Sequence, residues 1–166
     1  MNVNIALLTV TDTRTLDTDK SGNILEKKIK KASHKLIDRK ICKDSKKEIK
    51  KIIQKWLHKK KIDVIITTGG TGLTGRDITP EALNEVADKH IPGFGEVFRT
   101  LSLKTVGTSS IQSRACAVLA NGKYIFALPG SSGGVTDAWD KILIHQLDVN
   151  HKPCNFVELF PRLKEK

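Results

Sequence analysis

Short runs of apolar residues alternate along this chain with segments in which apolar residues recur every three or four positions. Residues 4–11, 63–67 and 124–128 form short β-prone apolar runs, which predict strands buried on both faces of a sheet. Residues 35–42 predict a further strand from a weaker pattern. The clearest helical pattern covers residues 46–60, where the apolar positions are Ile49, Ile52, Ile53, Trp56 and Leu57.

Further helices are predicted in the polar segments between and after these strands. Thr79-Pro80-Glu81 is typical of a helix start, because it combines a capping hydroxyl, a proline and an acid in the first turn. Asn121-Gly122 is interpreted as a helix end. The helices predicted in this way cover residues 21–32, 79–90, 95–102, 109–119 and a last segment around 139–143. Because strands alternate with helices, we expect an α/β fold with a mostly parallel sheet.

Length and composition favour one globular domain over residues 1–166, since 39 % of the residues are hydrophobic and 28 % are charged. No apolar run approaches the roughly 18 residues of a membrane span, and the first residues lack the basic start of a secretory signal. The three cysteines, Cys42, Cys116 and Cys154, are widely spaced and form no CxxC pair, which argues against disulfides and thiolate zinc sites. We therefore expect a cytoplasmic protein without a membrane partner.

Positive charge is concentrated in one part of the chain. Residues 20–61 contain 16 lysines and one arginine against four acidic residues, within a net charge of +11 for the whole chain. Such a block is compatible with nucleic-acid binding, which is driven by neutralisation of phosphates. However, only Trp56 interrupts the lysines, and Lys outnumbers Arg 23 to 6. We interpret the block as a solvated lysine face, with anion steering and nucleic-acid binding as the alternatives.

A glycine-rich loop, TTGGTGLTGRD, covers residues 67–77 directly after a predicted strand. Its glycines allow backbone N–H groups to turn toward one point, which makes an anion cradle, and its threonine hydroxyls add donors. Asp77 is a candidate Mg²⁺ ligand, because Mg²⁺ binds phosphates through one or two carboxylates and water, and Arg76 is a candidate phosphate partner. The alternative is that the glycines only turn a tight corner and Asp77 caps a backbone N–H.

A second loop and a second carboxylate are expected at the same edge of the sheet. Pro129-Gly130-Ser131-Ser132 follows the strand at 124–128 and precedes a helix, whose free N–H groups favour a phosphate or carboxylate. A plain strand-to-helix turn is the alternative. Asp44 follows the strand at 35–42 and is expected near Asp77, whereas its alternative role is to cap the helix that begins near Lys46.

Two familiar nucleotide-binding patterns do not fit the first loop. Residues 70–75 match G-x-G-x-x-G, but the next helix is predicted to open only at Thr79, outside the motif. Arg76-Asp77 stands where a Walker loop requires Lys followed by Ser or Thr. Neither pattern therefore assigns the loop.

Several short motifs do occur together, between about Ile5 and the end of the chain. They are Ile65–Gly72, Asp77, Thr79–Ala82, Gly93–Arg99, Gln112–Ala115, Leu128–Ser131 and the closing Pro153–Phe156. In order and spacing they resemble the MoaB/MogA family of molybdenum cofactor biosynthesis proteins, over nearly the whole chain. Gly93–Arg99 and Pro153–Phe156 resemble the MoaB branch in particular.

This resemblance implies a three-layer α/β fold with helices on both faces of the sheet, which binds molybdopterin as a homotrimer or homohexamer. In catalytically active members, Mg-ATP adenylylates the terminal phosphate of molybdopterin and releases pyrophosphate before molybdate is inserted. Some MoaB-type members occur beside a dedicated adenylyltransferase, so the alternative for this chain is a non-catalytic protein of the same pathway that binds or carries molybdopterin. Its partners would be other proteins of that pathway. Asp44 and Asp77 match the key acidic residues, with catalytic and Mg²⁺-binding roles. The cofactor-binding positions implied are Thr68, Gly69, Gly70, Thr71, Gly72, Pro129, Gly130, Ser131 and Ser132.

Overall fold

A computed structural model describes residues 1–165 and contains a six-stranded sheet with strand order β2-β1-β3-β6-β5-β4. β2, β1, β3 and β6 pair in parallel, whereas β5 pairs antiparallel with both β6 and β4. The predicted α/β fold with a mostly parallel sheet is confirmed. The strands are β1 (Asn4–Val10), β2 (Lys35–Cys42), β3 (Val64–Thr68), β4 (Lys89–His90), β5 (Cys116–Ala120) and β6 (Lys123–Leu128).

The three central strands direct their side chains alternately into two buried layers. In β1, Ile5 and Leu7 pack into the core on one face of the sheet, and Ala6 and Leu8 pack into the core on the other. β3 and β6 alternate in the same way, and all of their residues are buried. Because both faces are covered, these strands appear in the sequence as continuous apolar runs.

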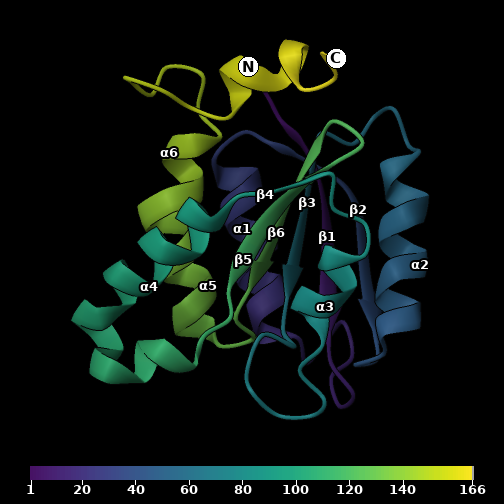
Figure 1. Cartoon of the computed structure of the whole chain (residues 1–166), viewed down its shortest axis with the longest axis vertical. Coiled ribbons are helices and arrows are strands. Elements are labelled where there is room, and N and C mark those ends of the chain that lie inside the picture. The colour runs from purple at the N-terminus through teal and green to yellow at the C-terminus, as the bar shows by residue number, and fades with distance from the viewer. Residues whose placement is uncertain (166) are drawn as a thin grey trace.

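Helices on both faces complete a three-layer fold (Figure 1). α1 (Lys20–Lys31), α4 (Pro92–Val106) and α5 (Ser132–Ala138) pack on one face of the sheet. α2 (Lys46–Leu57) and α3 (Thr79–Asn84) pack on the other face. The chain continues from α5 through a π-helical turn (Trp139–Leu143) into α6 (Ile144–Gln146), and a 3-10 helix (Val157–Arg162) follows near the C-terminus.

Side-chain caps explain where the first two helices begin. The buried carboxylate of Asp19 accepts a hydrogen bond from Gly22 N at 2.9 Å, which caps α1, so the helix starts at Lys20. The same carboxylate forms an ion pair with Arg39 at 2.9 Å. Ser45 Oγ accepts from Glu48 N at 3.4 Å at the start of α2. Ser45 is thus the residue that caps α2, which excludes the alternative capping role for Asp44.

The segment 109–119 is not the helix that we predicted. Gly107–Gln112 forms a 3-10 helix, and β5 begins after three intervening residues, at Cys116. Asn121 and Gly122, with φ angles of 47° and 69°, form the turn between β5 and β6. This backbone conformation at an Asn-Gly pair is the one that a two-residue β-hairpin requires. β4, which pairs with β5, was not predicted either.

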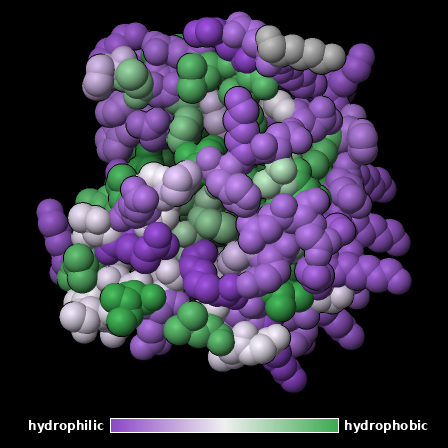
Figure 2. All heavy atoms as spheres, in the orientation of Figure 1, coloured by the Kyte–Doolittle hydropathy of each residue, from purple (hydrophilic) through white to green (hydrophobic). Residues whose placement is uncertain are grey.

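The lysine-rich segment covers the outer surfaces of α1 and α2, on opposite faces of the sheet, and the edge strand β2. Lys46, Lys47, Lys51 and Lys55 of α2 are exposed. Figure 2 shows hydrophilic side chains projecting on the side where Figure 1 places α2. No helix within residues 1–165 combines the length and apolar character needed to cross a membrane.

Candidate functional site

The carboxyl ends of the parallel strands bring the two predicted loops into direct contact, at the lower end of the sheet in Figure 1. Thr68 Oγ1 donates to the carbonyl of Pro129 at 2.8 Å, and Gly69 N donates to the carbonyl of Leu128 at 3.0 Å. The glycine-rich loop and the Pro129–Ser132 loop therefore form one surface, at the position where open α/β sheets bind ligands.

Gly69 and Gly70 cannot carry side chains in this arrangement. Their φ angles are +100° and +66°, in the left-handed region that favours glycine. A Cβ on Gly69 would collide with the carbonyl oxygen of Val10, and one on Gly70 would lie against Thr79 Oγ1 and 3.2 Å from Asp44 Oδ1. The tight turn thus brings the loop backbone next to both β1 and Asp44.

Asp77 lies within the glycine-rich loop and binds its backbone. Asp77 Oδ2 accepts hydrogen bonds from Thr74 N at 2.9 Å and Thr74 Oγ1 at 2.7 Å. Burial raises the pKa of Asp77, but hydrogen bonds from Thr74 and from the N–H of Gly72 outweigh it, so the pKa lies below its ordinary value. The backbone of the loop therefore already binds one carboxylate. These contacts are those of a residue that caps a backbone N–H, which is the alternative given above for Asp77.

Asp44 has the opposite electrostatic environment. Burial raises its pKa, and the negative charges of Asp12 and Asp77 raise it further. Asp44 and Asp77 are therefore close enough to interact, although β1 separates the strands β2 and β3 that precede them. No group of three or more His, Cys, Asp or Glu side chains in residues 1–165 is arranged to hold a metal ion by itself. Magnesium that is bound mainly through phosphates and water needs only one or two carboxylates.

Asp12 is a third carboxylate at this edge that the sequence analysis did not select. Its Oδ1 accepts from Asp44 N at 3.2 Å, and its Oδ2 pairs with Arg76 Nη1 at 3.1 Å. Arg76, a predicted phosphate partner, is thus held at the site by Asp12 with 78 % of its side chain exposed. The sequence could have indicated Asp12 by its position, because it follows β1 by two residues, just as Asp44 follows β2.

Arg114 fixes the far side of the glycine-rich loop, and its role was also missed. Its Nε donates to the carbonyl of Gly72 at 2.7 Å, its Nη2 donates to the carbonyl of Asp77 at 2.5 Å, and its Nη1 pairs with Glu81. One planar guanidinium therefore joins the middle and the last residue of the loop to α3. Arg114 belongs to a motif noted above, but its contacts lie more than thirty residues away along the chain.

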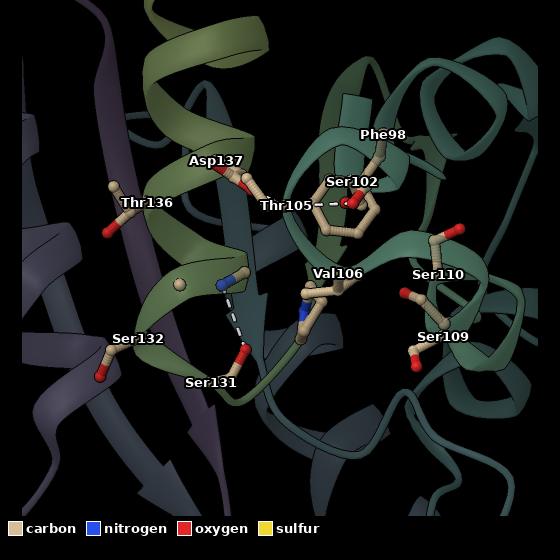
Figure 3. A pocket seen from close by; sticks show the side chains of 14 residues that line it. Phe98, Ser102, Thr105, Val106, Ser109, Ser110, Ser131, Ser132, Thr136 and Asp137 are labelled. Carbon is tan, nitrogen blue, oxygen red and sulfur yellow. Dashed lines mark hydrogen bonds between the residues drawn. The ribbon is translucent and has the colours of Figure 1, made fainter. Parts of the chain in front are cut away.

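The predicted cofactor-binding residues fall into two groups. Thr68 and Thr71 are buried, and the hydroxyl of Thr68 joins the two loops, so neither side chain faces an open site. Ser131 caps α5 through Gly134 N at 3.1 Å and, with Ser132, lines a cavity of about 590 Å³ beside α4 (Figure 3). The site thus has a carboxylate-rich part at the glycine loop and a cavity beyond the second loop.

Comparison with known proteins assigns this architecture to a family. A family model described as a probable molybdopterin binding domain matches residues 6–149. The chain is 43 % identical over 161 residues to the molybdenum cofactor biosynthesis protein B of Escherichia coli (strain K12), which covers 97 % of this chain and 93 % of that protein. The chain belongs to this molybdopterin-binding domain family.

Solved structures of the family share the fold over nearly the same length. A crystal structure of a molybdenum cofactor biosynthesis protein B superposes with a TM-score of 0.90 at 38 % identity, covering 100 % of this chain and 98 % of the other. The tungsten cofactor synthesizing protein MoaB from Pyrococcus furiosus superposes with a TM-score of 0.77 at 33 % identity, covering 86 % and 91 %. The three-layer arrangement is therefore that of the family.

Proposed function

We propose that this protein binds molybdopterin and adenylylates it with Mg-ATP. An oxygen of the terminal phosphate of molybdopterin attacks the α-phosphorus of ATP, and the bond from that phosphorus to the pyrophosphate oxygen breaks. Pyrophosphate leaves with the bonding electrons, and an AMP group joined to the phosphate of molybdopterin remains. Membership of the family and the resemblance of the loop motifs support this reaction class.

The observation that carries the proposal is the electrostatics around Asp44. Its pKa is raised by burial and by two further carboxylates, directly beside a glycine-rich loop whose backbone holds an anionic group. Excess negative charge next to an anion-binding backbone favours a divalent cation that joins carboxylates to phosphates. Oxygen ligands from Asp44 and Asp77 fit Mg²⁺, which would offset charge on the phosphates during the transfer.

The protein residues would act by positioning and charge, because phosphoryl-type transfers need little covalent help. Asp44 and Asp77 would hold the cation, the glycine-rich loop would orient a phosphate, and Arg76 would neutralise a phosphate oxygen from the solvent side. Asp12 would keep both Arg76 and the backbone of Asp44 in place.

Non-catalytic binding of molybdopterin is the second candidate, and the contacts of Asp77 favour it. The carboxylate of Asp77 is already occupied by donors of its own loop, which is the contact pattern of a structural residue. A carrier would bind the pterin and leave ATP intact.

The replacement Asp77→Asn tests the proposal. We expect AMP transfer to fall by at least about a hundredfold, because the variant loses a charged magnesium ligand while its amide oxygen still accepts from Thr74. The measurement is pyrophosphate release from ATP with purified protein, molybdopterin and Mg²⁺, with thermal unfolding to check the fold. Asp17→Asn, in an exposed part of the 12–19 loop, is the control for loss of one carboxylate.

Two results would contradict this assignment in different ways. Unchanged turnover in the Asp77→Asn variant would remove Asp77 from the mechanism. Pterin binding without any pyrophosphate release by the unmodified protein would support the carrier function instead.

A further inference from the structure

A groove of about 380 Å³ lies along the outer side of α2, on the face of the sheet that also carries α3 (Figure 1). We call it the α2 groove, and its lining residues are Lys46, Lys47, Lys50, Lys51 and Gln54 of α2 and Glu85, which follows α3. Lys46 comes two residues after Asp44 in the chain, so the groove begins beside the candidate site.

The α2 groove already binds one carboxylate, which belongs to Glu85. Glu85 Oε1 pairs with Lys46 Nζ at 2.6 Å, and its Oε2 pairs with Lys50. Hydrogen bonds from these two lysines lower the pKa of Glu85 to about 2, although its side chain is exposed. A carboxylate that bridges two lysines four residues apart is therefore an arrangement that this surface stabilises.

A second row of lysines in and beside the groove has no such partner. Lys47 and Lys51 are exposed and take part in none of the ion pairs within residues 1–165, and exposed Lys55 continues the row by one more turn. Neighbours in this row are separated by about 6 Å along the helix axis. Alternate residues of an extended chain share one side and lie about 6.6 Å apart, so an extended acidic segment matches the row with one carboxylate for each lysine.

The start of α2 is an unfavourable place for lysines as far as folding is concerned. The first turn of a helix carries a partial positive charge, which favours acidic side chains and disfavours basic ones. Glu48 fits this preference, whereas Lys46 and Lys47 oppose it, and Glu85 compensates only Lys46. Residues that break a local rule without compensation, as Lys47 does, are expected at functional sites.

Nucleic acid is the other polyanion that a row of lysines attracts. However, the α2 groove is lined by no arginine and no aromatic side chain, which are the residues that read and stack on bases. Trp56 of the same helix is fully buried, and its Nε1 donates to Asp38 at 2.9 Å. The carboxylates of a protein segment therefore fit this groove better than a nucleic acid does.

We propose that the α2 groove docks an extended acidic segment of a partner protein, whose carboxylates pair with Lys47 and Lys51. A partner bound in this way lies beside the end of the candidate site that holds Asp44. The inference goes beyond the proposed function, and it holds whether or not the protein adenylylates molybdopterin.

The test uses the full chain and two fluorescein-labelled probes, a peptide of about eight Glu-Ser repeats and an oligothymidine of equal charge, at low ionic strength where screening is weak. Fluorescence anisotropy measures the dissociation constant of each probe. We expect the peptide to bind, and the double variant Lys47→Gln with Lys51→Gln to bind it at least about fivefold more weakly, because two ion pairs are lost.

Lys27→Gln with Lys31→Gln is the matched control. These lysines are also exposed, four residues apart and absent from the ion pairs of the described chain, but they belong to α1, on the opposite face of the sheet. The control removes the same charge and should weaken binding of the peptide by less than about twofold. Glu85→Gln acts in the other direction, because it frees Lys46 and Lys50, and should tighten binding by about twofold or more.

The inference is overturned if the peptide does not bind at low ionic strength, if the two double variants weaken its binding equally, or if the oligothymidine binds more tightly than the peptide. Equal weakening would assign the binding to net charge alone, and a preference for oligothymidine would assign the groove to nucleic acid. Because neither ATP nor molybdopterin is present, these results are separate from those of the AMP-transfer assay.

Discussion

Asp44 is a carboxylate whose ionisation the fold opposes, since burial and the charges of Asp12 and Asp77 raise its pKa. A carboxyl group with a raised folded-state pKa lowers stability when it is ionised, and protonation removes that cost as the pH falls. Carboxyl groups whose pKa is raised by burial and by neighbouring like charges occur commonly at functional sites.

Asp44→Asn should therefore stabilise the protein at neutral pH. We expect the midpoint of thermal unfolding to rise by about 2–4 °C at pH 7.5, the shift that roughly 1 kcal/mol produces in a chain of this size. The gain should disappear as the pH falls through the folded-state pKa to below the unfolded value of about 3.9, where both side chains are neutral. Calorimetric scans from pH 7.5 to pH 3.5 measure this dependence, and an equal gain at every pH would contradict the electrostatic cause.

Sequence reasoning found Asp44 and Asp77 because each follows a recognisable strand, so topology alone brings them to one edge. Asp12 also follows a strand, but the segment after it is rich in Asp and Thr, and nothing in the sequence distinguishes one carboxylate there from the next. Arg114 could not be assigned a role, because its partners are set by tertiary contacts and not by spacing.

At the scale of elements, the glycine-rich loop depends on contacts from outside itself. Arg114 joins the carbonyls of Gly72 and Asp77 to Glu81 of α3. Glycine-rich segments gain most entropy on unfolding, so a fixed loop conformation requires such cross-links.

Arg114→Lys should loosen this loop while leaving the sheet intact. A lysine has one ammonium group and cannot satisfy two carbonyls and a carboxylate in the same plane, so we expect a loss of roughly 1–2 kcal/mol in the free energy of unfolding. The apparent KM for ATP should rise more than kcat falls, because the loop would orient the phosphate. Urea denaturation and initial rates test both expectations.

Arg162→Lys, at an exposed pair with Glu165, is the control and should change stability by less than about 0.5 kcal/mol. Equal effects of the two replacements would exclude the cross-link.

The elements themselves were predictable where local pattern and tertiary environment agree. The 35–42 strand was predicted with its observed bounds, and α2 ends only three residues earlier than predicted. Residues 109–119 were wrongly predicted as a helix because Cys116–Ala120 contains two alanines and no helix-breaking residue. In the structure this segment is a strand because it pairs with β6 and is largely buried. In the sequence, Asn121-Gly122 is typical of both a helix end and a β-hairpin turn. Only the apolar run that follows it, which forms β6, favours the hairpin.

At the scale of the whole molecule, the lysine-rich surface of α2 and the exposed apolar side chains of α4 lie on opposite faces of the sheet. The lysines of α2 are exposed, and Glu85 pairs with two of them, Lys46 and Lys50. Exposed lysines of this kind keep a protein apart from others of like charge. Apolar side chains are instead exposed along α4 and the 3-10 helix after it, at Val97, Leu103, Val106 and Ile111. Figure 2 shows hydrophobic atoms in this part of the surface, at the lower left.

The α4 side is therefore the part of the surface on which we expect copies of the chain to associate. Exposed apolar side chains that gather on one side favour burial against a partner, whereas the lysine-rich surface of α2 opposes it. The resemblance to the MoaB/MogA family predicts three or six copies, and light scattering on a size-exclusion column measures the mass. Ile111→Asp, at a side chain that is 77 % exposed, should reduce the mass to that of one 18.4 kDa chain without lowering the stability of the monomer. Leu16→Asp, at an exposed leucine in the 12–19 loop, should leave the assembly unchanged. A single chain in the unmodified protein would contradict self-association, and an Ile111→Asp variant that keeps the full mass would move the interface away from α4.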